Sequence, residues 1–207
     1  MRTIEIKVYQ FNELSDSAKQ HALDKYLEHQ DFSDLWYDAI STIRAFCDKT
    51  NVSTSRNSYA EPSFSHIDDA ILELSGFRLR TYFLNNFDFL YKRRYIKYFD
   101  CHKNHKNVVN KTAQTTKREY CFYYSSIWRD DTCCVLTGMC YDNDFLKPIY
   151  DFIAKPNNNN FKDIIEDCFY ELNQTVEREI EYLSTEDSFE EHCEANDYEF
   201  DERGNLI

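Results

Sequence analysis

The sequence predicts an α+β protein in which amphipathic helices pack on a small antiparallel sheet. Apolar residues recur at helical spacing over several segments, most clearly at 161–183, and other short stretches alternate apolar with polar residues. The 207 residues include only three glycines and three prolines, which argues against a loop-rich β-sandwich or a repeat solenoid. Sixteen Tyr and sixteen Phe exclude an intrinsically disordered chain. We expect a single domain over 1–207, with a basic, aromatic-rich and insertion-like region at about 78–129.

The N-terminal part predicts one strand followed by two helices. Residues 3–9 alternate apolar and polar side chains, as a half-buried strand does. Ser15 is placed to cap a helix, and Leu14 can pack against the first turn of that helix. Ser33 is placed to cap a second helix. One face of this second helix carries Trp36, Ile40, Ile43 and Phe46.

The central part of the chain is less periodic. The apolar run 70–74 is short for a helix and ends at Gly76, so it predicts a strand that bends there and continues through 84. The aromatic spacing between Phe87 and Tyr98 fits a helix, and the polar stretch 104–116 predicts a loop. Two β-rich segments, 119–126 and 132–141, predict a hairpin.

The C-terminal part predicts three helices and a terminal strand pair. A short helix over 145–154 stops before Pro156, and Asn160 can cap the next helix. Ser184 or Thr185 can cap a last short helix, and a strand pair is expected over 198–207. The long helix 161–183 has one apolar stripe, which consists of Ile164, Ile165, Cys168, Phe169, Leu172, Val176, Ile180 and Leu183.

Charge is segregated along the sequence. Residues 78–129 carry twelve Lys/Arg and three Asp/Glu, a balance of +9. The flanks are acidic, at −6 over residues 1–77 and −16 over residues 130–207, and the whole chain has a net charge of −13. Because like charges repel within a segment, an asymmetry of this size indicates either binding partners or internal pairing of opposite faces.

The basic segment combines cations with flat rings. Cations neutralise phosphates and rings stack on unpaired bases, so this mixture is typical of proteins that bind single-stranded RNA or DNA. The alternative is that the rings form a core and the cations pair with acidic helices of the same protein. The interleaved rings are Tyr82, Phe83, Phe87, Phe89, Tyr91, Tyr95, Tyr98 and Phe99. The candidate nucleic-acid or partner-binding residues are Arg78, Arg80, Lys92, Arg93, Arg94, Tyr95, Lys97, Lys103, Lys106, Lys117 and Arg118.

The acidic C-terminal third is a second candidate interface. A dense carboxylate surface can imitate a phosphate backbone and occupy the basic channel of a nuclease. The alternative is an ordinary solvated helix face, which has the same sequence pattern. The candidate acidic partner-binding residues are Glu177, Glu179, Glu181, Glu190 and Glu191.

The sequence gives little support to metal binding or catalysis. Cys101 and His105 have the residue types of a zinc pair, but a convincing second pair is missing, so we predict no metal site. His192 and Cys193 are sequence neighbours on a predicted helix and cannot meet productively. Asp130 and Asp131 lack a third ligand for Mg²⁺, and none of the standard catalytic or nucleotide-binding motifs occurs. We therefore predict no catalytic residue and no cofactor.

The sequence also bears on the cellular compartment. No basic segment followed by an apolar core opens the chain, and no run of 18 apolar residues occurs, so neither a secretory signal nor a membrane span is predicted. We expect a cytoplasmic protein that does not contact membrane, with its eight cysteines reduced.

Two segments resemble a known group of proteins. Residues 8–19 (V-Y-Q-F-N-E-L-S-D-S-A-K), continuing to Tyr26, resemble the F-x-E-L-S-x-x-A-K start of small phage and prophage proteins. Residues 181–186 and 194–200, with Gly204, resemble the other end of the same group. Two internal pieces, Trp36-Tyr37-Asp38 and Leu74-Ser75-Gly76-Phe77, also fit.

This family is mostly uncharacterised, and some of its members are labelled antitoxin-like. The likeness covers about the first 80 and the last 40 residues. It breaks at Arg78, where family members often have a short Gly-rich stretch and this chain begins its basic segment. The resemblance implies a phage or mobile-element origin and supplies no catalytic residue.

Taken with the charges, these features predict a non-enzymatic, phage-encoded inhibitor of a host defence nuclease, of the anti-CRISPR kind, acting in the host cytoplasm. Its basic, aromatic region would contact the RNA or an acidic surface of an RNA-guided effector, and its acidic helices would contact the basic channel. One alternative is an antitoxin-like protein that neutralises a protein toxin through the acidic C-terminal region. Another is a small metal-dependent nuclease.

Overall fold

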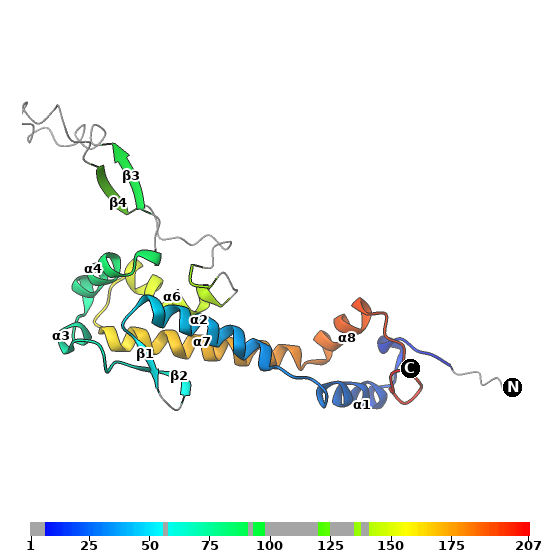
Figure 1. The fold of residues 1–207 in the computed structure, drawn as a ribbon. Coiled ribbons are helices and arrows are strands. Elements are labelled where there is room, and N and C mark those ends of the chain that lie inside the picture. Colours follow the sequence, from blue (N-terminus) through cyan, green and yellow to red (C-terminus); the bar gives the residue numbers. More distant parts are fainter. Residues whose placement is uncertain (1–6, 56–57, 91–92, 98–119, 125–134, 138–140) are drawn as a thin grey trace, which may run out of the picture. The chain divides into compact units, whose positions relative to one another are not determined.

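The structure, a computed structural model, describes residues 7–55, 58–90, 93–97, 120–124, 135–137 and 141–207. Within these residues it contains seven α-helices and two separate two-stranded antiparallel sheets, which confirms the α+β class (Figure 1). The chain forms two units. We call residues 1–39 and 172–207 the terminal unit, and residues 40–171 the central unit. The expectation of a single domain stays a prediction.

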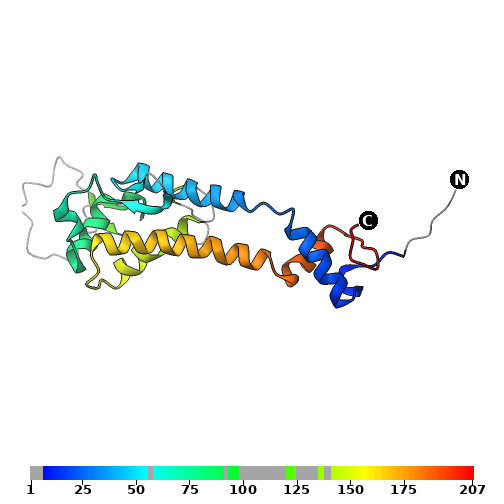
Figure 2. The ribbon, with the colours of Figure 1, turned by 90° about the horizontal axis from the view of Figure 1, so that it is seen from below.

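The terminal unit is built from short helices around a small core. Its elements are the 3-10 helix η1 (Phe11–Glu13), α1 (Asp16–Leu27) and α8 (Glu186–Ala195), followed by a C-terminal turn (Figure 2). Phe11 packs edge-on against Phe189, with ring centroids 5.0 Å apart. The buried core residues of this cluster are Phe11, Leu14, Ala18, Ala22, Leu23, Phe189, Cys193 and Phe200.

The two ends of the chain meet within the terminal unit. Tyr9 and Phe200 exchange two backbone hydrogen bonds of 2.9 Å as an isolated antiparallel bridge. Residues 3–6 of the strand expected at 3–9 lie outside the described residues. The strand pair expected over 198–207 is present as a single bridge between Phe200 and Leu206. Gly204 closes this turn at a φ of 84° against the backbone of Ala18.

Side chains accept hydrogen bonds at several helix starts, as the sequence pattern predicts. The Ser15 hydroxyl accepts a hydrogen bond from the N–H of Ala18 at the start of α1, and Thr185 caps α8 in the same way. Asn160 and Asp163 cap the long helix α7 (Phe161–Leu183) reciprocally, at 2.9 and 3.0 Å. The helix expected after Ser33, α2 (Ser33–Lys49), begins at Ser33 itself.

The core of the central unit consists of large rings. It gathers α2, α4 (Gly76–Asn86), α6 (Asp142–Ala154) and α7 (Figure 1). Phe145 of α6 lies between Phe46 and Phe169, at centroid distances of 4.9 and 5.3 Å. Phe83 of α4 packs against Phe152 and Phe161. The predicted stripe of α7 is confirmed, because its residues from Ile164 to Val176 are buried.

The strand predicted through 70–84 is wrong. This segment forms α3 (Asp69–Leu72) and α4 instead. The Asp68 carboxylate accepts a hydrogen bond of 2.8 Å from the N–H of Ala70 and so caps α3. Gly76, at a φ of 55°, marks the turn between the two helices. Leu79, Phe83 and Leu84 recur at helical spacing and are buried on α4.

One further prediction for the middle of the chain is wrong. The segment expected to be a helix from 87 to 98 forms the 3-10 helix η2 (Asp88–Leu90) and the strand β3 (Arg93–Lys97). The strand β4 (Tyr120–Tyr124) lies in the first of the two β-rich segments and pairs with β3. Of the second segment, only residues 135–137 and 141 belong to the described residues, so the hairpin expected between the two segments stays a prediction. The N–H groups of Leu136 and Thr137 donate to the Asp142 carboxylate, at 2.7 and 2.8 Å. The loop expected at 104–116 lies outside the described residues.

The remaining pair of strands was not predicted. The strands β1 (Ser53–Ser55) and β2 (Ser58–Ser63) pair antiparallel in the central unit, with an irregular register after Thr54. Among the helices in the described part of the chain, none is long and apolar enough to cross a membrane.

Candidate functional site

The strongest candidate site is the ribbon of β3 and β4. The two strands pair antiparallel over five rungs: Arg93 with Tyr124, Arg94 with Tyr123, Tyr95 with Phe122, Ile96 with Cys121 and Lys97 with Tyr120. Among the described residues, this sheet contains these two strands alone. A sheet of this size is marginally stable in water unless something packs on it.

The register divides the ribbon into two chemically different faces. Residues directly opposite each other in an antiparallel pair share a face, and successive residues alternate between faces. We call one of them the cationic-aromatic face, which consists of Arg93, Tyr95, Lys97, Tyr120, Phe122 and Tyr124. We call the other the opposite face, which consists of Arg94, Ile96, Cys121 and Tyr123. The ten residues include no carboxylate.

The structure places the predicted cations in different settings. By register, the cations Arg93 and Lys97 belong to the cationic-aromatic face, together with the predicted ring Tyr95. Arg94 belongs to the opposite face. Arg80 of α4 donates a hydrogen bond of 2.9 Å to the backbone oxygen of Ile153, so it helps to join α4 to α6. Arg78 is exposed on α4. The other predicted cations lie outside the described residues: Lys92, Lys103, Lys106, Lys117 and Arg118.

Several rings predicted to line a binding surface belong to the core. Phe83 and Phe87 are buried, and Phe89 stacks on Phe87 with centroids 5.4 Å apart. Tyr82 packs edge-on against Phe161. For the rings of α4 and η2 the structure thus agrees with the alternative stated above, in which they form a core. The rings of β4 were missed by the sequence reasoning, since only their pairing with β3 brings them beside the cations.

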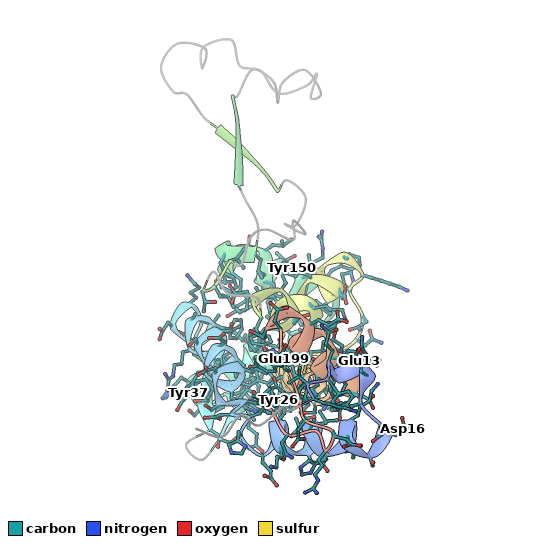
Figure 3. The ribbon with its side chains drawn as sticks, turned by 90° about the vertical axis from the view of Figure 1, so that its right-hand side faces the viewer. Glu13, Asp16, Tyr26, Tyr37, Tyr150 and Glu199 are labelled. Atoms are coloured by element: carbon teal, nitrogen blue, oxygen red, sulfur yellow. The ribbon has the colours of Figure 1, made fainter. Side chains whose placement is uncertain are left out.

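The predicted acidic residues also separate. Glu177 and Glu181 are exposed and lie one turn apart on α7, whereas Glu179 is half-buried. Glu191 accepts a hydrogen bond of 3.3 Å from the Tyr182 hydroxyl, and the negative charge of Glu191 raises the pKa of that tyrosine. Exposed carboxylates elsewhere in the terminal unit include Asp16 at the start of α1 and Glu199 beside Phe200 (Figure 3).

Glu190 lines a pocket of about 210 Å³ in the terminal unit. Glu194 and Asp197 add two further carboxylates, and the buried thiol of Cys193 lies among them. The remaining lining residues are Gln10, Phe11, Asn12 and Tyr198. Sequence reasoning missed the pocket because its two sides come from opposite ends of the chain. Its residues can accept hydrogen bonds from a cationic side chain.

The described thiols have the properties of structural residues. Burial, followed by the negative charge of Glu190, raises the pKa of Cys193 to about 11. Burial also raises the pKa of Cys47 to about 11 and that of Cys168 well above its ordinary value. A thiol with such a pKa is a poor nucleophile at neutral pH.

The structure bears only in part on the metal and nuclease hypotheses. Within the described ranges, no group of three His, Cys, Asp or Glu side chains is arranged to hold a metal ion. Cys101, His105, Asp130 and Asp131 lie outside those ranges. The absence of a catalytic or metal site therefore stays a prediction.

Asp142 is a buried carboxylate with a structural role. It accepts hydrogen bonds from the hydroxyls of Thr42 and Thr137, at 3.0 and 2.8 Å, in addition to the two N–H groups described above. Four donors from α2 and residues 136–137 thus converge on one side chain at the start of α6. Both carboxylate oxygens accept hydrogen bonds from the protein, so Asp142 joins the start of α6 to α2 and to residues 136–137.

Comparisons with protein-family models, with curated proteins and with solved structures find no significant match to this chain. The expected resemblance to small phage proteins therefore stays a prediction from the sequence.

Proposed function

We propose that this protein is a non-catalytic, phage-encoded inhibitor of an RNA-guided host nuclease, acting in the host cytoplasm. It offers two interfaces of opposite charge. The cationic-aromatic face of the ribbon contacts the RNA of the effector, and the carboxylates of the terminal unit contact the basic channel that normally receives nucleic acid. The phage origin rests on the sequence resemblance at both ends of the chain.

The observation that carries this proposal is the division of charge between the two units. Residues 1–39 contain four Lys/Arg and eight Asp/Glu, and residues 172–207 contain two and twelve, so the terminal unit has a net charge of −14. The central unit contains eighteen and seventeen, a net charge of +1. The terminal unit therefore accounts for the acidity of the chain, and a basic channel is the partner that its field attracts.

A matched pair of charge reversals on α7 tests the acidic interface. The variant Glu177→Lys with Glu181→Lys changes two exposed carboxylates of the terminal unit. The control Glu166→Lys with Asp167→Lys makes the same change in charge at two exposed positions of α7 in the central unit. The assay is DNA or RNA cleavage by a panel of purified guide-loaded nucleases, with the full-length protein added in increasing amounts.

We expect the wild-type protein to inhibit one nuclease of the panel. The 177/181 variant should weaken this inhibition by about tenfold or more, because like charges then face the basic channel, and the control should change it by less than about threefold. Equal losses in both variants would show that only the overall charge matters. Metal-stimulated cleavage by the protein itself would refute a non-catalytic inhibitor.

A second candidate is an antitoxin-like protein, which the carboxylate-lined pocket of the terminal unit favours. A toxin that presents a Lys or Arg side chain could insert it between Glu190 and Glu194. Under this alternative, Glu190→Gln with Glu194→Gln abolishes rescue of cells from a co-expressed toxin, and no guided nuclease of the panel is inhibited.

A further inference from the structure

The pocket of the terminal unit offers a more specific contact than overall charge does. We propose that it binds the guanidinium group of an arginine side chain that projects from the basic surface of a partner protein. This inference deepens the proposed function and rests on it for the identity of the partner. Binding of a small arginine compound to the isolated protein can nevertheless be measured without any nuclease.

The first argument is that three carboxylates line the pocket without a partner. Glu190, Glu194 and Asp197 belong to its wall, and none of the eight lining residues is basic. Across the described part of the chain, these three side chains make no hydrogen bond and no ion pair. Glu190 is half-buried, so its charge loses part of its hydration without compensation. A cation bound in the pocket would supply that compensation.

The second argument is the place of the pocket on α8. Glu190, Cys193 and Glu194 lie one turn apart on the same side of this helix, and Asp197 follows its end at a φ of 51°. The C-terminal end of a helix carries a partial negative charge, which adds to that of the carboxylates. The thiol of Cys193, which is 3% exposed, also lines the pocket and has no hydrogen-bond partner among the described residues. The pocket therefore presents acceptors of hydrogen bonds and a field that selects cations.

The third argument concerns the kind of cation. Within the described ranges, which include the whole pocket, no three His, Cys, Asp or Glu side chains are arranged to hold a metal ion. Carboxylates that do not converge on one point suit a planar guanidinium, whose five N–H donors point in several directions. An ammonium group is a compact point charge and would reach fewer of them. We therefore commit to arginine over lysine and over a metal ion.

The fourth argument is the aromatic part of the wall. Phe11 and Tyr198 both line the pocket, and a guanidinium can stack on the face of such a ring. The Phe11 ring already attracts one cation of this chain, since Nζ of Lys19 lies 5.3 Å from its centroid. Phe11 is buried, whereas Tyr198 is only half-buried. The ring of Tyr198 is therefore the surface on which the guanidinium would stack.

The test is a titration of the full-length protein with N-acetyl-arginine amide, in which NMR follows the backbone N–H groups. We expect saturable shifts at Gln10, Asn12 and residues 193–198, with a Kd of about 1 mM for so small a compound. The matching lysine compound should bind at least about threefold more weakly. The citrulline compound has the same shape without the charge and should bind at least about tenfold more weakly.

Two matched pairs of variants test the carboxylates. Glu190→Gln with Glu194→Gln should weaken binding of the arginine compound by about tenfold, because both carboxylates line the pocket. The control Glu177→Gln with Glu181→Gln removes the same two charges from exposed positions of α7 in the terminal unit. This control should change the affinity by less than about twofold, since neither residue lines the pocket.

A second pair of variants tests the ring. Tyr198→Leu should weaken binding by about threefold or more through lost stacking. Tyr198→Phe keeps the ring and should bind within about twofold of the wild-type protein. Melting temperatures of all variants show whether they remain folded, and the comparison with Tyr198→Phe holds even where Tyr198→Leu unfolds.

Several results would overturn the inference. Undetectable binding by the wild-type protein, or shifts that lie outside the pocket, would refute the site. Equal affinity for the arginine, lysine and citrulline compounds would refute recognition of a guanidinium. Equal weakening by the 190/194 and 177/181 pairs would show that net charge attracts the compound and that the pocket does not.

The nuclease assay separates this inference from the proposed function. If the pocket recognises the partner, the 190/194 pair should weaken inhibition by about tenfold. Full inhibition by this pair would overturn the arginine contact with the partner and leave the proposed function on the other carboxylates of the terminal unit. If no nuclease of the panel is inhibited but the pocket binds the arginine compound selectively, the proposed function fails and the guanidinium site is supported.

Discussion

The two units of this protein differ in net charge and in the residues that form their apolar cores. The terminal unit has a net charge of −14 around a core of eight buried residues, two of which are alanines. The central unit is nearly neutral and packs a cluster of phenylalanines between its helices. A net charge of this size opposes self-association of the terminal unit, whereas the central unit depends on close packing of its rings.

The comparison shows that the same residue type serves different purposes in neighbouring segments of the central unit. Phe83 and Phe87 are buried, whereas Phe122 belongs to a two-stranded ribbon. Composition alone cannot distinguish these two uses. Position in the fold does, and the following predictions probe how each unit maintains its structure.

The largest effect is expected at the glycine that closes the terminal unit. A Cβ at Gly204 would lie 2.1 Å from the backbone oxygen of Ala18, at a φ of 84°. Gly204→Ala should therefore lower the free energy of unfolding by about 4 kcal/mol, from overpacking against α1 together with left-handed strain. Urea denaturation followed by circular dichroism measures it.

Gly76 in the central unit is the matched control. Its φ is also positive, at 55°, but the nearest atom to an added Cβ, the backbone oxygen of Asn157, is 3.7 Å away. Gly76→Ala should cost only the conformational strain of about 1–2 kcal/mol. Equal costs at the two glycines would mean that the C-terminal turn does not pack tightly on α1.

The next largest effect is expected at the buried carboxylate of the central unit. Asp142→Ala leaves four donors without their acceptor and should cost about 3 kcal/mol of stability. Thr42→Val removes one of those donors and should cost about 1 kcal/mol. A cost for Asp142→Ala no larger than that for Thr42→Val would contradict the structural role of this carboxylate.

A smaller, pH-dependent effect is expected in the terminal unit. Hydrogen bonds from the side chain and the backbone N–H of Asn205 lower the pKa of Asp201 from its ordinary value of 3.8. A lowered pKa in the folded state contributes stability above pH 3.8, and this contribution is lost as the pH falls through the lowered value. Thermal melts should show Asp201→Asn less stable than wild type at pH 7, with the difference shrinking below pH 3.8. A difference that stays constant with pH would contradict this linkage.

The smallest effect is expected at Tyr150 in the central unit. Its hydroxyl is buried without a hydrogen-bond partner among the described residues. Burial and then the negative charge of Asp142 raise its pKa to about 12. Tyr150→Phe removes an unsatisfied polar group and should leave stability unchanged or raise it by up to about 1 kcal/mol. A clear loss of stability would show that this hydroxyl makes an interaction outside the described residues.

Much of the helical structure could be predicted because local signals agree there. At α7, the apolar stripe and the cap at Asn160 both lead to the helix observed, Phe161–Leu183. At α3 and α4 the signals conflict, since a run of four or five apolar residues fits a strand as well as a helix turn. The structure has a capped helix there, with Asp68 as the cap, and Gly76 lies between two helices and not at a bend in a strand.

The candidate site could be predicted only in part. Arg93, Tyr95 and Lys97 were identified from their chemistry, but Arg80 proved to join two helices. The rings of β4 were not identified, because pairing across the more than twenty residues that separate the strands leaves no local pattern in the sequence. Register is a property of long-range pairing, and it alone places Arg93 and Arg94 on different faces.

The bridge between Tyr9 and Phe200 has a consequence for the order in which the protein can form. During synthesis, the segment that contains Phe11 and Leu23 leaves the ribosome long before Phe189 and Phe200, which cover it in the finished core. The central unit, contiguous from 40 to 171, can fold in the interval. The terminal unit must therefore be completed last, because the whole of the central unit separates its two parts in the sequence.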